Sequence, residues 1–282
     1  MKENLLVILK SNKIKFSKLQ RRVGDYIIKY PLESSFITLE TFASRLEIST
    51  TTVVRFCLKL GYTGFSELQK DLQDLVKERI APHGRLEANL KTIKEDTLLA
   101  QCAQKSIENI TLSQSLISSD ICESTISLIS TARKIYLIGQ RTSYTVSYFL
   151  FQALNQILGN CHLIDPISGI DQLSSATNQD IVIAVSLPRY ARSTLELVKV
   201  LKKQHNLKII SITDSYTAPL AAYSDILLPC HYASLSFHNS MSSALFIADY
   251  IVTAVAIAKK QQAADHLVDL EKILVELNFH ID

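Results

Sequence analysis

The stretch TLETFASRLEISTTTVVRFCLKLGY, residues 38–62, predicts two short helices joined by a tight turn. Thr38 can cap the first helix, and Ser49 can cap the second by accepting hydrogen bonds from its first free backbone amides. The buried face of the second helix is set by four apolar residues spaced i, i+3, i+4 and i+7: Val53, Phe56, Cys57 and Leu60. Gly61 follows at the position where a left-handed residue ends a helix.

The face of the second helix that stays in solvent is polar and basic. With the capping serine, its residues are Ser49, Thr50, Thr51, Thr52, Arg55 and Lys59. Short hydroxyls near a helix start can approach phosphates or base edges, and an arginine can donate two hydrogen bonds to guanine. This is the geometry of a helix that enters the major groove of DNA. The alternative is a generic three-helix bundle with a solvated polar face.

The segments on either side complete an all-helical domain, which we assign to residues 1–80. The earlier helix ends at Pro31 and carries an apolar stripe: Leu19, Val23, Tyr26 and Ile27. A later helix begins near Phe65 and turns three leucines inward: Leu68, Leu72 and Leu75. The domain holds 14 Lys+Arg and 9 Asp+Glu, a net charge of +5, against a net of −2 (16 and 18) for the rest of the chain. A basic domain of this kind fits contact with DNA phosphates.

The remainder of the chain follows a different pattern. The segment APHGR, residues 81–85, contains Pro and Gly and predicts a linker, so residues 81–118 are assigned to the linker and a connecting helix. Residues 119–282 then form a second domain with five apolar strands: 134–139, 161–165, 181–186, 208–213 and 225–230. Apolar strands separated by helices predict an α/β domain with a parallel five-stranded sheet flanked by helices.

Cysteine spacing and hydropathy narrow the class of protein further. The five cysteines are odd in number and widely spaced, which favours buried free thiols over a disulfide framework or a zinc site. We expect no metal and no cofactor. The apolar segment 244–258 is interrupted by Asp249 and is too short to span a bilayer. We therefore expect a cytoplasmic protein with no membrane partner.

The stretch STTTVVRFCLKLGYTGFSEL, residues 49–68, resembles the N-terminal domain of the RpiR family of bacterial transcriptional regulators. In that family a segment of the type S-x-x-T-V-x-R-F-x-K-K-L-G-[YF]-x-G-F-x-E-[LF] spans the recognition helix and the start of the next helix. The matching residues are Ser49, Thr52, Val53, Arg55, Phe56, Leu60, Gly61, Gly64, Phe65 and Glu67. Leu58 departs from the pattern, because a second lysine is frequent there. The resemblance implies that the second domain is a sugar isomerase (SIS) domain that binds a phosphosugar.

The sequence YLIGQRTS, residues 136–143, stands where a SIS domain has a loop between a strand and a helix. The start of a helix can bind phosphate through its free N–H groups and its dipole. Gly139 is expected to permit the turn, while Thr142 and Ser143 supply hydroxyls. Arg141 replaces a glycine that is usual in the family, and it either pairs with the phosphate or turns to solvent.

A second loop, SLPRYARSTLE at residues 186–196, resembles a variant found in some RpiR-type regulators, with P-R-Y-S-R-E-T after the first serine. The guanidinium of Arg189 suits a phosphate or a carboxylate, and Tyr190 offers a ring that can stack on a sugar. The ligand-binding residues implied by the two loops are Gly139, Arg141, Thr142, Ser143, Ser186, Arg189, Tyr190, Ser193 and Thr194, with Asp214 as a lesser candidate. The alternative is an ordinary surface loop rich in arginine.

These features together predict a DNA-binding transcriptional regulator of sugar or phosphosugar metabolism, whose effector is a phosphosugar. The main alternative is a SIS-type sugar-phosphate isomerase with an accessory helical domain, and a third is a sensor whose N-terminal domain binds protein. An isomerase needs a general base. No motif supports any of the four residues that could serve, so no catalytic residue is assigned: His162, Glu196, His231 and His238.

We expect a homodimer or a homotetramer, because a two-fold arrangement lets two recognition helices reach successive major grooves of an operator. Helical segments near 239–260 and 264–277 offer apolar residues for such an interface: Leu245, Ile251, Val255, Leu267, Leu270 and Leu274. The other possibility is that these helices simply cover their own sheet.

Overall fold

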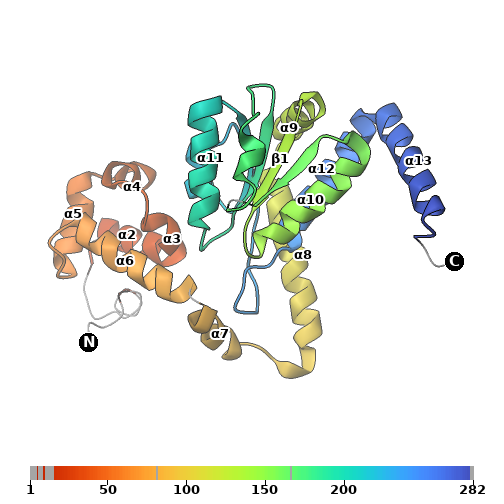
Figure 1. The fold of residues 1–282 in the computed structure, drawn as a ribbon. Coiled ribbons are helices and arrows are strands. Elements are labelled where there is room, and N and C mark those ends of the chain that lie inside the picture. The colour runs from red at the N-terminus through yellow and green to blue at the C-terminus, as the bar shows by residue number, and fades with distance from the viewer. Residues whose placement is uncertain (1–4, 6–8, 10–15, 81, 166, 280–282) are drawn as a thin grey trace. The chain divides into compact units, whose positions relative to one another are not determined.

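The computed structural model describes residues 5, 9, 16–80, 82–165 and 167–279. The chain folds into two compact units, Met1–Lys91 and Thr92–Asp282. The first unit is helical, and the second combines a parallel sheet with helices, as predicted (Figure 1).

The described helices of the first unit are α2 (Lys18–Lys29), α3 (Pro31–Ser34), α4 (Leu39–Arg45), α5 (Thr50–Lys59), α6 (Phe65–Ile80) and α7 (Pro82–Leu90). The two predicted caps are confirmed. The Thr38 hydroxyl accepts a hydrogen bond from the amide of Thr41 at 3.2 Å, and the Ser49 hydroxyl accepts one from the amide of Thr52 at 3.2 Å. Each cap satisfies an N–H group that the helix itself leaves unpaired, and therefore fixes where the helix begins.

One apolar core holds this unit together. It includes Val23, Ile27, Phe42, Val53, Phe56, Leu68 and Leu72. Two glutamines of α6 fasten the segment that leads into α4: Gln69 donates to the carbonyl of Ile37 at 2.7 Å, and Gln73 donates to the carbonyl of Ser35 at 2.8 Å.

Leu19 and Leu75 are two residues predicted for this core whose burial is not confirmed. Leu19 was expected on the buried stripe but is 42% exposed. It lies one turn before Val23, in the first turn of α2, and it is not part of the apolar core formed by the described residues. The side chain of Leu75 is outside the part of the chain that the structure describes, so its inward orientation stays a prediction.

The described part of the predicted linker 81–85 is helical, because α7 begins at Pro82. Proline suits the first position of a helix, where its fixed φ is already helical and its missing N–H is not needed. The boundary between the two compact units follows Lys91, just after the end of α7, and not the proline.

The second unit opens with η1 (Glu95–Thr97), α8 (Leu98–Leu116) and α9 (Ser119–Thr131). Its strands are β1 (Ile135–Gly139), β2 (Cys161–Ile164), β3 (Ile181–Val185), β4 (Lys208–Thr213) and β5 (Ile226–Pro229). The helices that follow the strands are α10 (Ser143–Leu158), η2 (Ile170–Leu173), α11 (Arg192–His205), η3 (Pro219–Tyr223), α12 (Ser242–Ala258) and α13 (Lys260–Glu276).

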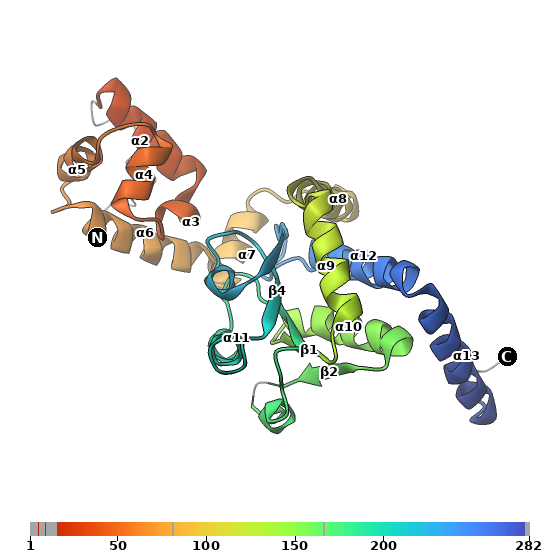
Figure 2. The same ribbon diagram turned by 90° about the horizontal axis from the view of Figure 1, so that it is seen from above.

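The five strands are parallel and lie in the order β2-β1-β3-β4-β5. One apolar core, on the face of α10 and α12, and a second core, on the face of α11, bury the two sides of the sheet (Figure 2). The chain leaves β1 toward one edge and returns to β3 on the other side, so the direction of winding reverses between β1 and β3. Ligands of open α/β sheets bind beyond the carboxyl ends of the strands at such a point.

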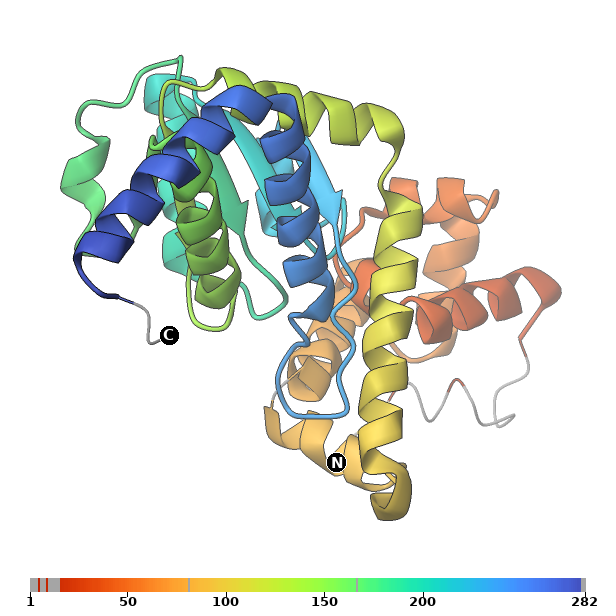
Figure 3. The ribbon, with the colours of Figure 1, turned by 90° about the vertical axis from the view of Figure 1, so that its right-hand side faces the viewer.

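The two C-terminal helices bury themselves to different extents. Ile251 and Val255 of α12 are buried in their own unit, where α12 runs beside α8 (Figure 3). On α13 only Ala263 is buried, and Leu267 is 45% exposed. Within the described ranges no single helix is long and apolar enough to cross a bilayer; α12 and α13 pass that test only as a pair, and they are bent by 104°.

All five cysteines are free. Three of them are buried, namely Cys57, Cys161 and Cys230, while Cys122 is half-buried and Cys102 is exposed. Burial raises the pKa of Cys57 and of Cys161 to about 12. These two thiols are therefore protonated and unreactive near neutral pH.

Gly139 is required by packing. A Cβ there would lie 2.8 Å from the backbone oxygen of Ser143 and closer still to the Ser147 hydroxyl, because the first turn of α10 lies against the end of β1. We expect Gly139→Ala to lower the free energy of unfolding by about 1–3 kcal/mol, since the backbone must shift to admit the methyl group. Urea denaturation followed by circular dichroism measures this.

Gly64→Ala is the matched control, because a Cβ at Gly64 meets nothing within 4 Å. Equal stability of the two alanine variants would contradict the packing argument.

Candidate DNA-binding and ligand-binding sites

The six polar residues predicted to contact DNA divide into two groups. Ser49 and Thr52 are engaged with each other, because their hydroxyls lie 2.9 Å apart and the Ser49 hydroxyl also accepts the Thr52 amide. The other four are exposed on the outward face of α5: Thr50, Thr51, Arg55 and Lys59. The first group fixes the start of the helix, and the second group is left to make contacts.

The neighbours of α5 explain why its outward face is presented in this way. Phe56 is fully buried, and its ring centroid lies 5.1 Å from that of Phe16. Gly61 adopts a φ of 88°, a left-handed conformation that ends the helix at low cost. Glu67 then accepts hydrogen bonds from the amide and the hydroxyl of Thr63, at 2.7 and 2.8 Å, and so fixes the start of α6.

The two predicted ligand loops leave the sheet side by side. Gly139, the last residue of β1, pairs in register with Val185, the last residue of β3. The Ser193 hydroxyl donates to the side-chain oxygen of Gln140 and joins the two loops directly. Asn239, which precedes α12, donates to the carbonyl of Pro188 at 2.9 Å. Three segments far apart in the sequence therefore meet at the carboxyl ends of β1 and β3.

The start of α11 is open. The helix has no side-chain cap, and among the described residues the amides of Arg192, Ser193 and Thr194 find no acceptor. The hydroxyl of Thr194 is fully buried and also lacks a partner. Unpaired N–H groups at the positive end of a helix form a binding site for an anion.

The first backbone amides of α10, in contrast, are already hydrogen-bonded. The amides of Ser143, Tyr144 and Thr145 donate to the carbonyls three residues earlier, at 3.1 to 3.2 Å. Ser143 itself is buried, and Thr142 is exposed. The two predicted helix starts thus differ, and the loop before α10 contributes side chains more readily than backbone amides.

Two arginines occupy backbone conformations that favour glycine. Arg141 has a φ of 56° and Arg189 has a φ of 71°, and both side chains are exposed. The expectation that Gly139 permits the turn is wrong, because Arg141 is the left-handed residue of that loop. The reason for glycine at 139 is its contact with Ser143 and Ser147.

Tyr190 and Asp214 form a half-buried pair beside these loops. The Tyr190 hydroxyl donates to Asp214 at 2.9 Å, and the Thr213 hydroxyl donates to Asp214 at 3.2 Å and to the carbonyl of Ser186 at 2.6 Å. Burial is the main cause that raises the pKa of the Asp214 carboxyl. From the sequence alone Asp214 is only a minor candidate, and Gln140 and Asn239 are not candidates at all, because nothing in their local sequence indicates a partner so distant along the chain.

The four residues considered as general bases lie on three different segments of the second unit. His162 is on β2 opposite Tyr136, and Glu196 is on α11, where its carboxylate lies 3.9 Å from the Lys199 amine. His231 and His238 are in the segment between β5 and α12. No hydrogen bond or ion pair joins any two of the four within the described part of the chain.

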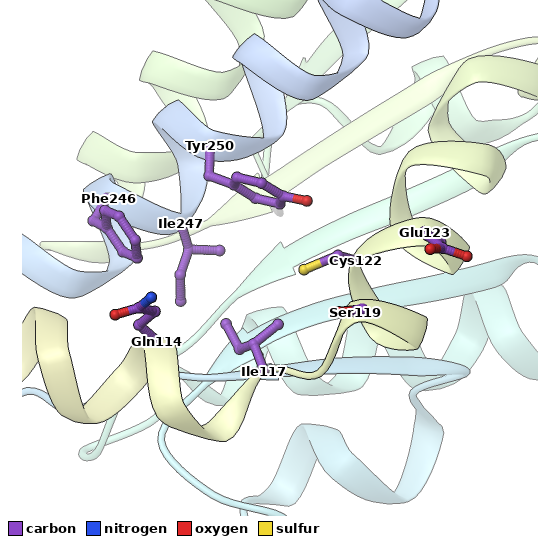
Figure 4. Close-up of a pocket in the computed structure, with 8 residues that line it drawn as sticks. All are labelled: Gln114, Ile117, Ser119, Cys122, Glu123, Phe246, Ile247 and Tyr250. Atoms are coloured by element: carbon purple, nitrogen blue, oxygen red, sulfur yellow. The ribbon is translucent and has the colours of Figure 1, made fainter.

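A cavity of about 430 Å³ lies between the junction of α8 and α9 and the helix α12 (Figure 4). Its lining is mainly apolar and consists of Gln114, Ile117, Ser119, Cys122, Glu123, Phe246, Ile247 and Tyr250. A hydrogen bond with Cys122 raises the pKa of Tyr250 to about 12. None of the residues predicted from the sequence as ligand contacts lines this cavity.

Comparison with known families assigns both units. Residues 3–78 match the family described as "Helix-turn-helix domain, rpiR family", and residues 128–254 match the "SIS domain". The chain is 25% identical over 221 residues to an uncharacterized HTH-type transcriptional regulator of Haemophilus influenzae, covering 75% of this chain and 74% of that protein. It is 23% identical over 299 residues to the HTH-type transcriptional regulator HexR of Pseudomonas aeruginosa, covering 99% of each.

Two solved structures share the fold. The Vibrio vulnificus NanR protein complexed with ManNAc-6P has a TM-score of 0.64 at 23% identity, covering 97% of this chain and 99% of that one. The sugar isomerase domain of an RpiR transcription factor from Sphaerobacter thermophilus has a TM-score of 0.60 at 20% identity, covering 62% of this chain and 99% of that one.

The raised pKa of Asp214 has a consequence for stability. As pH rises above 3.8, the ordinary value, the unfolded chain loses this proton first, so the folded state loses stability until its own, higher pKa is passed. Asp214→Asn keeps an acceptor for Tyr190 and removes the charge. We therefore expect the free energy of unfolding of this variant, relative to that of the parent protein, to be higher at pH 7 than at pH 4. Urea denaturation at the two pH values measures this difference.

Asp249→Asn serves as the control, because Asp249 is exposed on α12 of the same unit. The account is contradicted if Asp214→Asn and the parent show the same pH dependence.

Proposed function

This chain belongs to the RpiR family of helix-turn-helix transcriptional regulators with a SIS domain, and we propose that a phosphosugar bound at the carboxyl ends of β1 and β3 controls its binding to operator DNA. The two relatives described above are named as transcriptional regulators, which confirms the prediction of a regulator over an isomerase. The finer assignments of residues and ligand below are our proposal.

The first unit is proposed to bind the major groove of double-stranded DNA through α5. Thr50, Thr51, Arg55 and Lys59 lie exposed on one face of this helix, and the cap formed by Ser49 and Thr52 fixes its start. The net charge of +5 on residues 1–80 (14 basic against 9 acidic) supports phosphate contacts around that helix. In this arrangement Arg55 reads a base, and Lys59 contacts a phosphate.

The observation that carries the ligand proposal is the open start of α11. Its free amides and the unpaired hydroxyl of Thr194 offer donors of the kind that a phosphate accepts. The similar NanR protein was solved with ManNAc-6P, a phosphosugar, which supports the same ligand class here. The proposed contacts are Arg141, Thr142, Ser143, Ser186, Arg189, Tyr190, Ser193 and Thr194, with Gly139 allowing the helix to approach the strand.

The effector is proposed to act by binding one arrangement of the protein more tightly than another. A ligand shifts a conformational equilibrium only through its different affinities for the two states. We propose that the working form is a homodimer or a homotetramer in the cytoplasm. Exposed apolar residues of α13, Leu267 among them, support an interface there.

Replacing Arg55 or Lys59 by alanine separates base reading from phosphate contact. We expect Arg55→Ala to cost about 1–3 kcal/mol on the operator and to relax the preference for one base pair. Lys59→Ala should weaken binding to all duplexes alike and reduce the dependence of binding on salt. Fluorescence anisotropy with operator and unrelated duplexes over a range of salt concentrations measures both.

Lys70→Ala is the matched control, since Lys70 is an exposed basic residue on α6. If the Arg55 and Lys59 variants bind DNA no differently from the Lys70 variant, then α5 is not the recognition helix.

Thr194→Val removes the unpaired hydroxyl and keeps the shape of the side chain. Because this hydroxyl has no partner in the described structure, the variant should be at least as stable as the parent. A lost hydrogen bond to a charged phosphate should nevertheless weaken effector binding by about 1.5–3 kcal/mol. Calorimetry with a panel of phosphosugars that includes ManNAc-6P, together with thermal unfolding, measures the two effects.

Thr253→Val, at an exposed site on α12, controls for the loss of a hydroxyl. An effector that binds Thr194→Val as tightly as it binds the parent would remove the α11 start from the site.

A further inference from the structure

The arginines of the second unit are unevenly distributed. The unit contains four: Arg133, Arg141, Arg189 and Arg192. The guanidinium of Arg133 is neutralised, because it donates to both oxygens of Asp180, at 2.9 and 2.6 Å. The other three lie on the loops beyond β1 and β3 and at the start of α11, and within the described residues none of them pairs with a carboxylate.

Acidic groups at this edge of the sheet make other contacts. Asp165, which follows β2, accepts hydrogen bonds from the amides of Ile167 and Ser168, at 2.9 and 2.7 Å. Asp214 is half-buried and accepts hydrogen bonds from Tyr190 and Thr213. Glu196 lies within 3.9 Å of the amine of Lys199 on its own helix. Among the described residues, the two loops and the start of α11 therefore present three guanidinium groups that form no ion pair with a carboxylate, next to the free amides of α11.

Each of the three arginines stands where the backbone disfavours it. Arg141 and Arg189 hold left-handed conformations, which glycine adopts at lower cost. Arg192 is the first residue of α11, at the positive end of the helix dipole, where a cation is repelled. Residues held against such preferences cluster at binding sites, where a bound group repays the cost.

One phosphate does not account for all three. A phosphate monoester carries about 1.5 to 2 negative charges at neutral pH. The open amides of α11, together with Arg189 and Arg192 on the same segment, already match that charge. Arg141 is left over on the neighbouring loop, which the bond between Ser193 and Gln140 holds beside the start of α11.

We propose that the effector carries a second anionic group besides its phosphate, and that Arg141 binds this group. A carboxylate and a second phosphate share the required chemistry, because each accepts two parallel hydrogen bonds from a guanidinium. The effector class is therefore a phosphorylated sugar acid or a sugar bisphosphate. This inference rests on the proposed function and extends it.

Ligand pairs that share one phosphate and the same carbon chain, and in which one member carries a second anion, test the inference. Calorimetry on the full chain compares glucose 6-phosphate with 6-phosphogluconate, ribose 5-phosphate with 5-phosphoribonate, and fructose 6-phosphate with fructose 1,6-bisphosphate. Near-physiological salt limits long-range charge effects. We expect the doubly anionic member of at least one pair to bind with a Kd at least about tenfold lower than its partner.

The variant Arg141→Gly identifies the residue responsible. Glycine accepts the φ of 56°, so the loop can keep its course while the guanidinium is lost. In this variant the preference should fall to about twofold or less, because the affinity for the doubly anionic member falls further than the affinity for its singly anionic partner. Lys203→Ala, which removes an exposed positive charge near the other end of α11, should leave the preference intact.

The possible outcomes distinguish a failure of the inference about the second anion from a failure of the proposed function. Tighter binding of the acids indicates a carboxylate, and tighter binding of the bisphosphate indicates a second phosphate. If sugar phosphates bind and no pair shows a preference, or if Arg141→Gly keeps the preference, the inference about the second anion is wrong. If no member of any pair binds, the proposed phosphosugar function fails together with it.

Discussion

The parallel pairing of β1 with β3 is the constraint on which the second unit depends. These strands are neighbours in the sheet although β2 lies between them in the sequence. From β1 the chain runs to β2 at one edge of the sheet, and it then returns to β3 on the other side of β1. In-register pairing of Gly139 with Val185 then ends both strands at the same level. The polar loops that follow are brought together there, and α10 packs so closely against β1 that residue 139 has no room for a side chain.

Much of the fold was predictable because its signals are local. The helix starts at Leu39 and Thr50 follow from capping side chains three residues away from the amides that they bind, and the strands follow from short apolar runs. The helix at Pro82 was missed, because proline and glycine indicate a linker as readily as a first helical turn. The end of α2 was correct at Pro31, but the exposure of Leu19 depends on which helices lie nearby, and that is a property of the tertiary structure.

That the two candidate loops lie together could be predicted from the sequence, whereas the contacts between them could not. The loops were identified from their resemblance to SIS-domain loops and from their place after apolar strands, and the register places them side by side. The bond from Ser193 to Gln140 and the pairing of Tyr190 with Asp214 join segments that are distant in the sequence, so no local pattern reveals them. The same holds for the difference between the open start of α11 and the closed start of α10, which depends on the turn geometry of each loop.

The central claim is that the amides at the start of α11 hold the phosphate of the effector. Hydrogen exchange of the full chain, followed by mass spectrometry with and without a phosphosugar that changes its DNA affinity, tests this claim most directly. We expect slower exchange in peptides that cover residues 187–196, because the phosphate would accept hydrogen bonds from the free amides of Arg192, Ser193 and Thr194. Unchanged exchange there, with protection appearing around the cavity between α8, α9 and α12, would contradict it.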